Sequence, residues 1–137
     1  MRLNRSLRAA LVVALPLAAA LFFSARAQSA DPVQQPAIRI TPPKLEFPSQ
    51  PVNTESAPAV ATVTNLSADP VTITDILVSG IDFAETTTCG QTLSPSASCI
   101  VSVTFTPVIT GPRLGTLTII DSAPGSPRMI GLSGTGK

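Results

Sequence analysis

The segment from Phe83 to Gly111 holds both cysteines of the chain and its most regular alternation of apolar and polar side chains. The apolar positions of one parity are Cys99, Val101, Val103 and Phe105. Ser102 and Thr104 lie between them. A two-residue period of this kind is typical of a β-strand with one buried face. The segment therefore predicts a β-protein in which the strand after Cys99 contributes to the core.

The two cysteines predict a structural disulfide between Cys89 and Cys99. Closing a loop of about ten residues contributes on the order of 3 kcal/mol to stability in the chain-entropy model. The alternatives are two free thiols or a thiolate zinc site, and zinc is disfavoured because the chain has no histidine. No Lys, Arg or His lies between the two cysteines to stabilise a thiolate, so a redox role is not expected.

The first 27 residues have the pattern of a cleaved signal peptide. Arg2, Arg5 and Arg8 precede an uncharged apolar stretch over residues 9–23, and Ala25-Arg26-Ala27 matches an A-x-A cleavage signal. The apolar stretch is short for a transmembrane anchor, which needs about 20 residues. We predict cleavage between Ala27 and Gln28 and export to the periplasm or beyond, where disulfides persist. No cysteine lies near the cut, which disfavours a lipoprotein anchor.

The chain after residue 27 carries five basic and eight acidic residues, a net charge of −3. The basic residues do not cluster, so we expect neither nucleic acid nor anionic lipid as a partner. No second apolar run follows, so we expect no membrane anchor after cleavage. About 110 residues suit one domain. We predict a flexible leader over residues 28–37 and a single domain over residues 38–137.

Several short strands are predicted between turns rich in Pro, Gly and Asp. Prolines limit residues 38–48 to an edge strand or to one that switches between sheets at Pro42-Pro43. The strand expected over residues 59–65 places Ala61 and Val63 inward. The strand over residues 71–78 changes phase between Ile73 and Ile76, which predicts a bulge. Further strands are expected over residues 114–120, with Leu117 and Ile119 inward, and over residues 129–132, after a turn at residues 107–112, and Phe83 is expected in the core. This pattern predicts an immunoglobulin-like antiparallel β-sandwich.

Five short motifs resemble the ASH-type domain, the Hydin and abnormal-spindle immunoglobulin-like module also found in bacterial choice-of-anchor D proteins. They are a strand ending at Asn65, Gly80-Ile81-Asp82-Phe83, the Cys89/Cys99 pair, the V-T-F-T-P of residues 103–107 and the L-S-G-T-G of residues 132–136. The resemblance covers residues 38–136. It implies a sandwich of seven to nine strands, similar to major sperm protein and to pilus chaperone domains, and a non-catalytic module that binds other proteins.

The composition disfavours catalysis and several kinds of binding site. Without histidine the chain has no Ser-His-Asp or Cys-His system, and without Trp or Tyr it has no sugar-stacking platform. The acids that could gather around calcium are Asp69, Asp75, Asp82, Glu85 and Asp121. They fall in different loops and are interpreted as solvated turn residues. Asn65-Leu66-Ser67 is interpreted as an Asx-type turn rather than a glycosylation site. We expect no catalytic, cofactor or metal site.

The leading hypothesis is an exported interaction or scaffold protein whose partner is another protein, bound at a sheet edge or face. Because prolines protect residues 38–51, contact is expected at another edge strand, with Ser102 and Thr104 as examples of its polar side chains. The alternative is a periplasmic chaperone-like protein or a surface-fibre subunit. It is disfavoured because the chain has one domain, no basic cleft and a polar leader. A hydrolase is the third possibility, and the missing histidine disfavours it.

Overall fold

The computed structural model describes residues 35–137, and all secondary-structure elements in this part are β-strands. The predicted signal peptide, its cleavage point between Ala27 and Gln28, and most of the predicted leader lie outside these residues. The nine strands are β1 (Ile38–Thr41), β2 (Lys44–Glu46), β3 (Ala59–Asn65), β4 (Val71–Ser79), β5 (Phe83–Thr87), β6 (Thr92–Leu93), β7 (Ser98–Phe105), β8 (Gly111–Asp121) and β9 (Arg128–Gly136).

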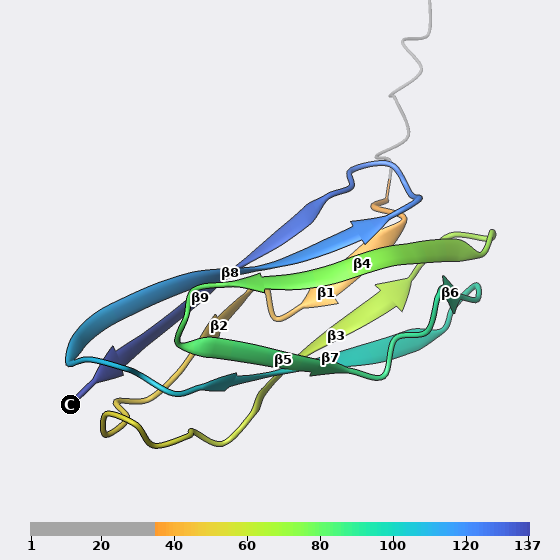
Figure 1. Cartoon of the computed structure of the whole chain (residues 1–137). Helices are drawn as coiled ribbons and strands as arrows, with labels where there is room; N and C mark the ends of the chain where they lie inside the picture. The colour runs from red at the N-terminus through yellow and green to blue at the C-terminus, as the bar shows by residue number, and fades with distance from the viewer. Residues whose placement is uncertain (1–34) are drawn as a thin grey trace, which may run out of the picture. The chain divides into compact units, whose positions relative to one another are not determined.

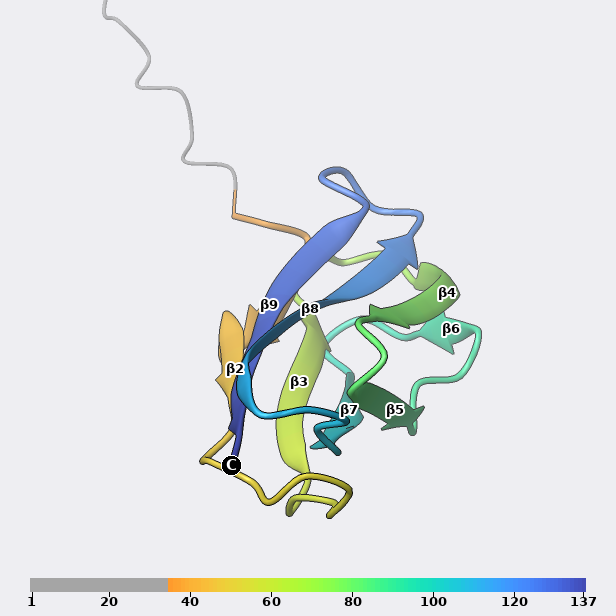
Figure 2. The same cartoon turned by 60° about the vertical axis from the view of Figure 1, so that its left-hand side comes forward.

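The strands form two packed sheets, which confirms the predicted immunoglobulin-like sandwich (Figure 1). One sheet has the order β1-β3-β7-β5 and the other has the order β2-β9-β8-β4-β6. All pairs of neighbouring strands are antiparallel except β2 and β9, which are parallel. Figure 2 shows β4 and β5, from different sheets, on the same side of the sandwich.

The core lies between the inner faces of the two sheets. Its fully buried side chains include Val63, Val101, Val103 and Phe105 from one sheet and Leu117, Ile119, Ile130 and Leu132 from the other. The rings of Phe47, Phe83 and Phe105 form a cluster with centroids 5.1 to 5.7 Å apart. The inward positions predicted from alternation in β3, β7 and β8 are confirmed, as is Phe83 in the core.

The proline pair near the start of the domain marks a change of sheet. β1 pairs with β3 in the four-stranded sheet, whereas β2 pairs with β9 in the five-stranded sheet. Pro42 and Pro43 lie between the two strands, where neither residue has to supply a ladder donor. The sequence left open whether residues 38–48 form an edge strand or switch between sheets. Both are true, because the chain changes sheet at Pro42-Pro43 and β1 and β2 are each the edge strand of a sheet.

The phase change predicted in β4 is a bulge, since the register of β4 against β8 shifts between Ile73 and Asp75. Ile73 and Ile76 can both point inward only because one extra residue is inserted between them. The bulge lies where β4 leaves its short pairing with β6, which covers only Val71 and Thr72.

Four boundaries or elements differ from the prediction. β8 begins at Gly111 rather than at Leu114, and β9 continues to Gly136 rather than ending at Leu132. The closing glycines belong to the strand because Gly134 and Gly136 pair with Arg113 and Gly111 of β8. β5 and β6 were not predicted as strands.

Candidate interaction site

The two sheets have four edge strands, and three of them are poor templates for pairing. β1 has four residues and runs into Pro42, β2 has three residues between two proline-containing segments, and β6 has two residues. Short edges and prolines hinder the addition of a further strand. The remaining edge is β5, which has five residues and no proline.

The hydrogen bonds of β5 show which of its backbone groups face away from β7. Thr88 N–H donates to Ile100 O (2.9 Å) and Thr106 N–H donates to Asp82 O (2.7 Å). In an antiparallel pair, residues that bond to the neighbour alternate with residues that do not. Ala84 and Thr86 therefore bond to β7, and the backbone groups of Glu85 and Thr87 point to the opposite side. We call this opposite side of Phe83–Thr87 the β5 edge.

Ser102 and Thr104, which were expected to lie on an edge strand, do not. Their strand β7 is paired on both sides, with β3 and with β5, so it offers no open backbone. The prediction was wrong because alternation shows which face of a strand is buried but not whether the strand is central. Both side chains are half-buried on the outer face of the four-stranded sheet.

The predicted disulfide is present and ties the end of β5 to the start of β7 through Cys89 and Cys99. Cys99 is buried and Cys89 is partly buried. The Cys89 N–H also donates to Thr87 Oγ1 (2.9 Å). The bridge therefore fixes the segment that continues from the β5 edge toward β6.

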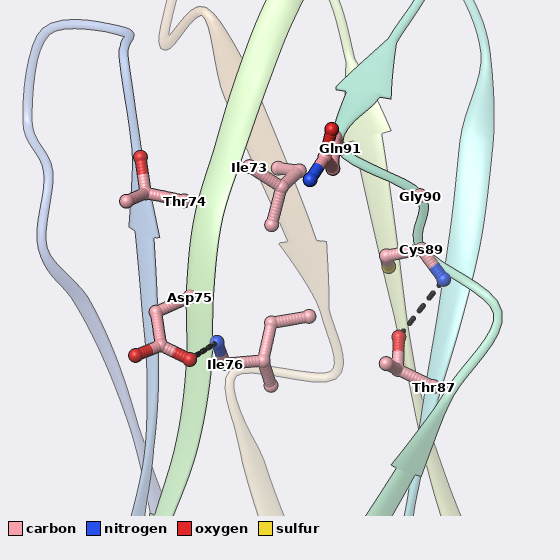
Figure 3. A pocket seen from close by; sticks show the side chains of 8 residues that line it. All are labelled: Ile73, Thr74, Asp75, Ile76, Thr87, Cys89, Gly90 and Gln91. Atoms are coloured by element: carbon pink, nitrogen blue, oxygen red, sulfur yellow. Dashed lines mark hydrogen bonds between the residues drawn. The ribbon is translucent and has the colours of Figure 1, made fainter.

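A groove lies between the sheets where β4 faces the chain after β5. It has a volume of about 320 Å³. Its lining residues are Ile73, Thr74, Asp75, Ile76, Thr87, Cys89, Gly90 and Gln91. Figure 3 shows the Ile73 and Ile76 side chains on the side of β4 that faces the Cys89–Gln91 segment. We call this feature the β4–β5 groove.

The β4 rim of the groove is partly closed to pairing. Ile73 N–H donates to Gln91 O (2.9 Å), and Ile76 N–H donates to Oδ1 of Asp75 (2.9 Å). A bulge and a charged side chain at an edge both hinder strand addition. The two rims of the groove therefore differ, because the β5 rim keeps its outward backbone groups while two donors of the β4 rim are already bonded.

Two of the five acids interpreted as solvated turn residues are instead buried in ion pairs. Asp82 Oδ2 accepts from Arg113 Nε (2.7 Å) and Asp121 Oδ2 accepts from Arg128 Nε (2.8 Å). Both aspartates also accept backbone N–H bonds, from Val108 and from Ala123. The turn preference of Asp predicts an exposed carboxylate. It does not indicate that Asp82 binds Arg113 or that Asp121 binds Arg128.

Burial acts to raise the pKa of the Asp82 carboxyl, but the bond from Val108 N–H and the Arg113 guanidinium outweigh it, so the pKa lies below its ordinary value. Asp82 joins the turn before β5 to the loop after β7, because its backbone carbonyl accepts from Thr106 while its side chain binds Val108 and Arg113. These contacts fix the start of β5.

Asn65 forms the predicted Asx-type turn, with its Oδ1 accepting from Ser67 N–H (2.9 Å). The side chain is fully buried, and its Nδ2 donates to Asp69 O (2.8 Å) and Leu93 O (3.0 Å). The bond to Leu93 O joins the end of β3 to β6, so Asn65 connects the two sheets at the end where β6 lies.

Residues 35–137 contain no group of three or more Cys, Asp or Glu side chains placed to hold a metal ion. Within the same residues, no helix is long and apolar enough to cross a membrane.

The β5 edge could not be predicted from the sequence because its inward positions are not apolar. After Phe83, the inward positions hold Glu85 and Thr87, which lie at the rim of the sandwich rather than over the core. The one available signal was the six-residue segment without proline between Asp82 and Cys89, and this segment has no apolar alternation.

Comparison with solved structures supports this architecture. The chain is similar to a Porphyromonas gingivalis W83 protein of unknown function (TM-score 0.63, 12% identity), with 73% of this chain matching 46% of that one. It is similar to PapD-like domain 7 of human CEP192, an ASH/PapD-like domain (TM-score 0.58, 16% identity, 77% of this chain and 91% of that one). It is also similar to part of the secreted serine protease VesC from Vibrio cholerae (TM-score 0.59, 18% identity, 75% of this chain and 24% of that one). At these identities the similarity shows the fold alone.

No curated protein matches the chain in sequence. The family model described as "Abnormal spindle-like microcephaly-assoc'd, ASPM-SPD-2-Hydin" matches residues 36–129, which is more than half of the chain and nearly all of the sandwich. The nine-stranded sandwich and this match agree with the resemblance carried by the sequence motifs, and the chain belongs to the ASH domain family.

Proposed function

We propose that this protein is an exported, non-catalytic module that binds another protein by adding a strand at the β5 edge. The observation that carries the proposal is the pairing pattern of β5, which leaves the backbone groups of Glu85 and Thr87 directed away from β7. An extended segment of a partner could hydrogen-bond to these groups and continue the four-stranded sheet.

The architecture around β5 supports this role. The disulfide holds the segment that follows Thr87, and the Asp82–Arg113 pair holds the turn before Phe83. An edge fixed at both ends loses little conformational freedom when a partner binds, which favours affinity. Membership of the ASH family supports a protein-binding role as well.

Two features support export. The basic head, apolar stretch and A-x-A signal of residues 1–27 fit a secretory signal. The Cys89–Cys99 disulfide suits an oxidising compartment. Expression of the full chain in a Gram-negative host should yield an exported protein whose first residue is Gln28 by N-terminal sequencing. Retention of residues 1–27 in the exported protein would contradict the signal-peptide proposal.

The binding proposal is tested with two baits that differ at one residue. Glu85→Pro removes an outward N–H from the β5 edge without removing a bond to β7. The wild-type chain should recover a protein from the extracytoplasmic fraction of its host, and the Glu85→Pro chain should recover much less of it. Recovery of no protein at any salt concentration would contradict a binding role, and equal recovery by both baits would place the contact elsewhere.

The fold gives less support to the alternative of a chaperone-like protein or a fibre subunit. A subunit that needs a donated strand exposes part of its core before assembly, whereas Val103, Phe105 and Leu117 are fully buried here. Residues 35–137 also give no support to the basic cleft of a chaperone, because Lys44, Arg113 and Arg128 are each bonded to an acidic side chain.

A further inference from the structure

We infer that the β4–β5 groove receives an extended partner segment in which an aliphatic side chain lies two residues from a lysine or arginine. The inference rests on the strand addition proposed above and names the chemistry of the partner. Three properties of the site lead to it: the direction in which side chains of an added strand would point, the apolar residues of the groove, and the acidic side chain of Glu85 on the β5 rim.

The register of β5 determines where the side chains of an added strand would lie. Glu85 pairs with Val103 and Thr87 pairs with Val101, and both valines are fully buried on the inner face. Glu85 and Thr87 therefore share the inner face, and Thr87 itself lines the groove. Because side chains alternate along a strand, every second residue of a segment paired with β5 would point to the same side, toward the groove.

The groove is suited to a single aliphatic side chain. Ile73 is buried and Ile76 is partly buried, and both line the groove from β4. The volume of about 320 Å³ exceeds that of one side chain and leaves room for part of the backbone that carries it. A branched aliphatic residue would cover the exposed apolar surface of Ile76 beside the buried Ile73, and such residues also favour the extended conformation that pairing requires.

The charge of Glu85 on the β5 rim selects a basic neighbour. Glu85 lies two positions before Thr87, about 7 Å along the strand, whereas the Asp75 carboxylate lies on the side of β4 away from the Cys89–Gln91 segment (Figure 3). Among the described residues, the three ion pairs engage Glu46, Asp82 and Asp121, and neither Glu85 nor Asp75 takes part in one. A Lys or Arg two residues from the aliphatic side chain would share its face and lie opposite Glu85, so charge complementarity favours it.

A second copy of this chain fits the site poorly. If two β5 strands paired about a two-fold axis with full overlap, Glu85 would lie directly opposite Glu85 of the second copy, and like charges in that position are destabilising. The sequence of residues 28–34 does not match the expected partner segment either, since it contains Asp31 and Pro32 and no basic residue. A separate partner with a basic and aliphatic segment is the occupant that the site favours.

The experiment selects peptides of about twelve residues from a random display library on the disulfide-bonded chain, and measures their affinity by calorimetry. Enriched sequences should carry an aliphatic residue two positions from Lys or Arg. Affinity of the best peptide should fall about two- to fivefold with Glu85→Gln and about tenfold or more with Glu85→Pro. Glu46→Gln, which removes an equal charge from an exposed site on β2, should leave the affinity unchanged.

A charge exchange tests the pairing without relying on the proline variant. Replacing the basic residue of the peptide with Glu should weaken binding to the wild-type chain, and Glu85→Lys should restore it. Peptides that lose affinity with Glu85→Pro but not with Glu85→Gln or the charge exchange would overturn the inference while leaving strand addition intact. Peptides insensitive to Glu85→Pro, or a dimer of the free chain that Glu85→Pro dissociates, would overturn the inference as well. Failure to enrich any binding peptide would count against the proposed function itself.

Discussion

At the scale of single residues, the domain depends on buried polar side chains that hold its turns. Asp82, Asp121 and Asn65 are each buried and each bond to backbone groups of another segment. Leaving such a group without its partner costs about 1–3 kcal/mol. These residues explain how turns rich in Pro and Gly keep one conformation around a core of only moderate size.

Asp82→Asn should lower the free energy of unfolding by about 1–3 kcal/mol at pH 7, because it removes the charged bond to Arg113. The pKa of Asp82 is lowered in the folded chain. Its contribution is therefore complete above the ordinary Asp pKa of about 3.9 and is lost as the pH falls through the lowered folded value. Urea unfolding from pH 7 to pH 2 should show the two proteins converge at the acid end. A difference that stays constant down to pH 2 would contradict this role of the carboxylate.

At the scale of strands, the glycines of β9 show how closely the two sheets pack. A Cβ on Gly134 would lie 2.6 to 2.8 Å from three Phe105 ring atoms, whereas a Cβ on Gly131 would meet nothing within 4 Å. Gly134→Ala should therefore destabilise the fold by about 1–3 kcal/mol, a fall in melting temperature of about 4–8 °C for each kcal/mol. Gly131→Ala on the same strand is the matched control and should stay within about 0.5 kcal/mol. Equal effects of the two substitutions would show that the contact with Phe105 is unimportant.

The disulfide acts between elements, since it holds the chain after β5 against β7. Replacing both residues, Cys89→Ser with Cys99→Ser, should cost on the order of 3 kcal/mol and lower the melting temperature accordingly. Binding of a selected peptide should remain measurable once the variant is folded, because the outward backbone groups of the β5 edge are unchanged, although the Cys89 side chain also lines the β4–β5 groove. A variant as stable as the wild type but unable to bind would show that the pair belongs to the working site.

The strands that sequence analysis recovered are those with an apolar alternation facing the core. The inward residues of β3, β7 and β8, the bulge in β4 and the sheet change at Pro42-Pro43 all followed from local rules. Local rules did not recover β5, because an edge strand at the rim has polar inward residues such as Glu85. They also did not show that β7 is central or that Asp82 meets Arg113, because both facts depend on which distant segments become neighbours.

At the scale of the whole molecule, one side of the sandwich differs from the other. On the side of β1 and β2, the chain passes from one sheet to the other at a proline pair. On the side of β4 and β5, the strands leave a groove whose β4 rim is partly bonded and whose β5 rim is open (Figures 2 and 3). The candidate site is therefore a property of the assembled sheets, which is why no single motif in the sequence indicated it.

Backbone amide exchange measured by NMR tests the central claim, the addition of a strand at the β5 edge, most directly. The amides of Glu85 and Thr87 point away from β7, whereas those of Ala84 and Thr86 bond to it and serve as internal controls. In the chain alone, Glu85 and Thr87 should exchange fast and the two controls should be protected. With a saturating selected peptide, exchange at Glu85 and Thr87 should slow by about tenfold or more, while the controls stay protected. Fast exchange at Glu85 and Thr87 in the saturated complex would contradict strand addition at the β5 edge.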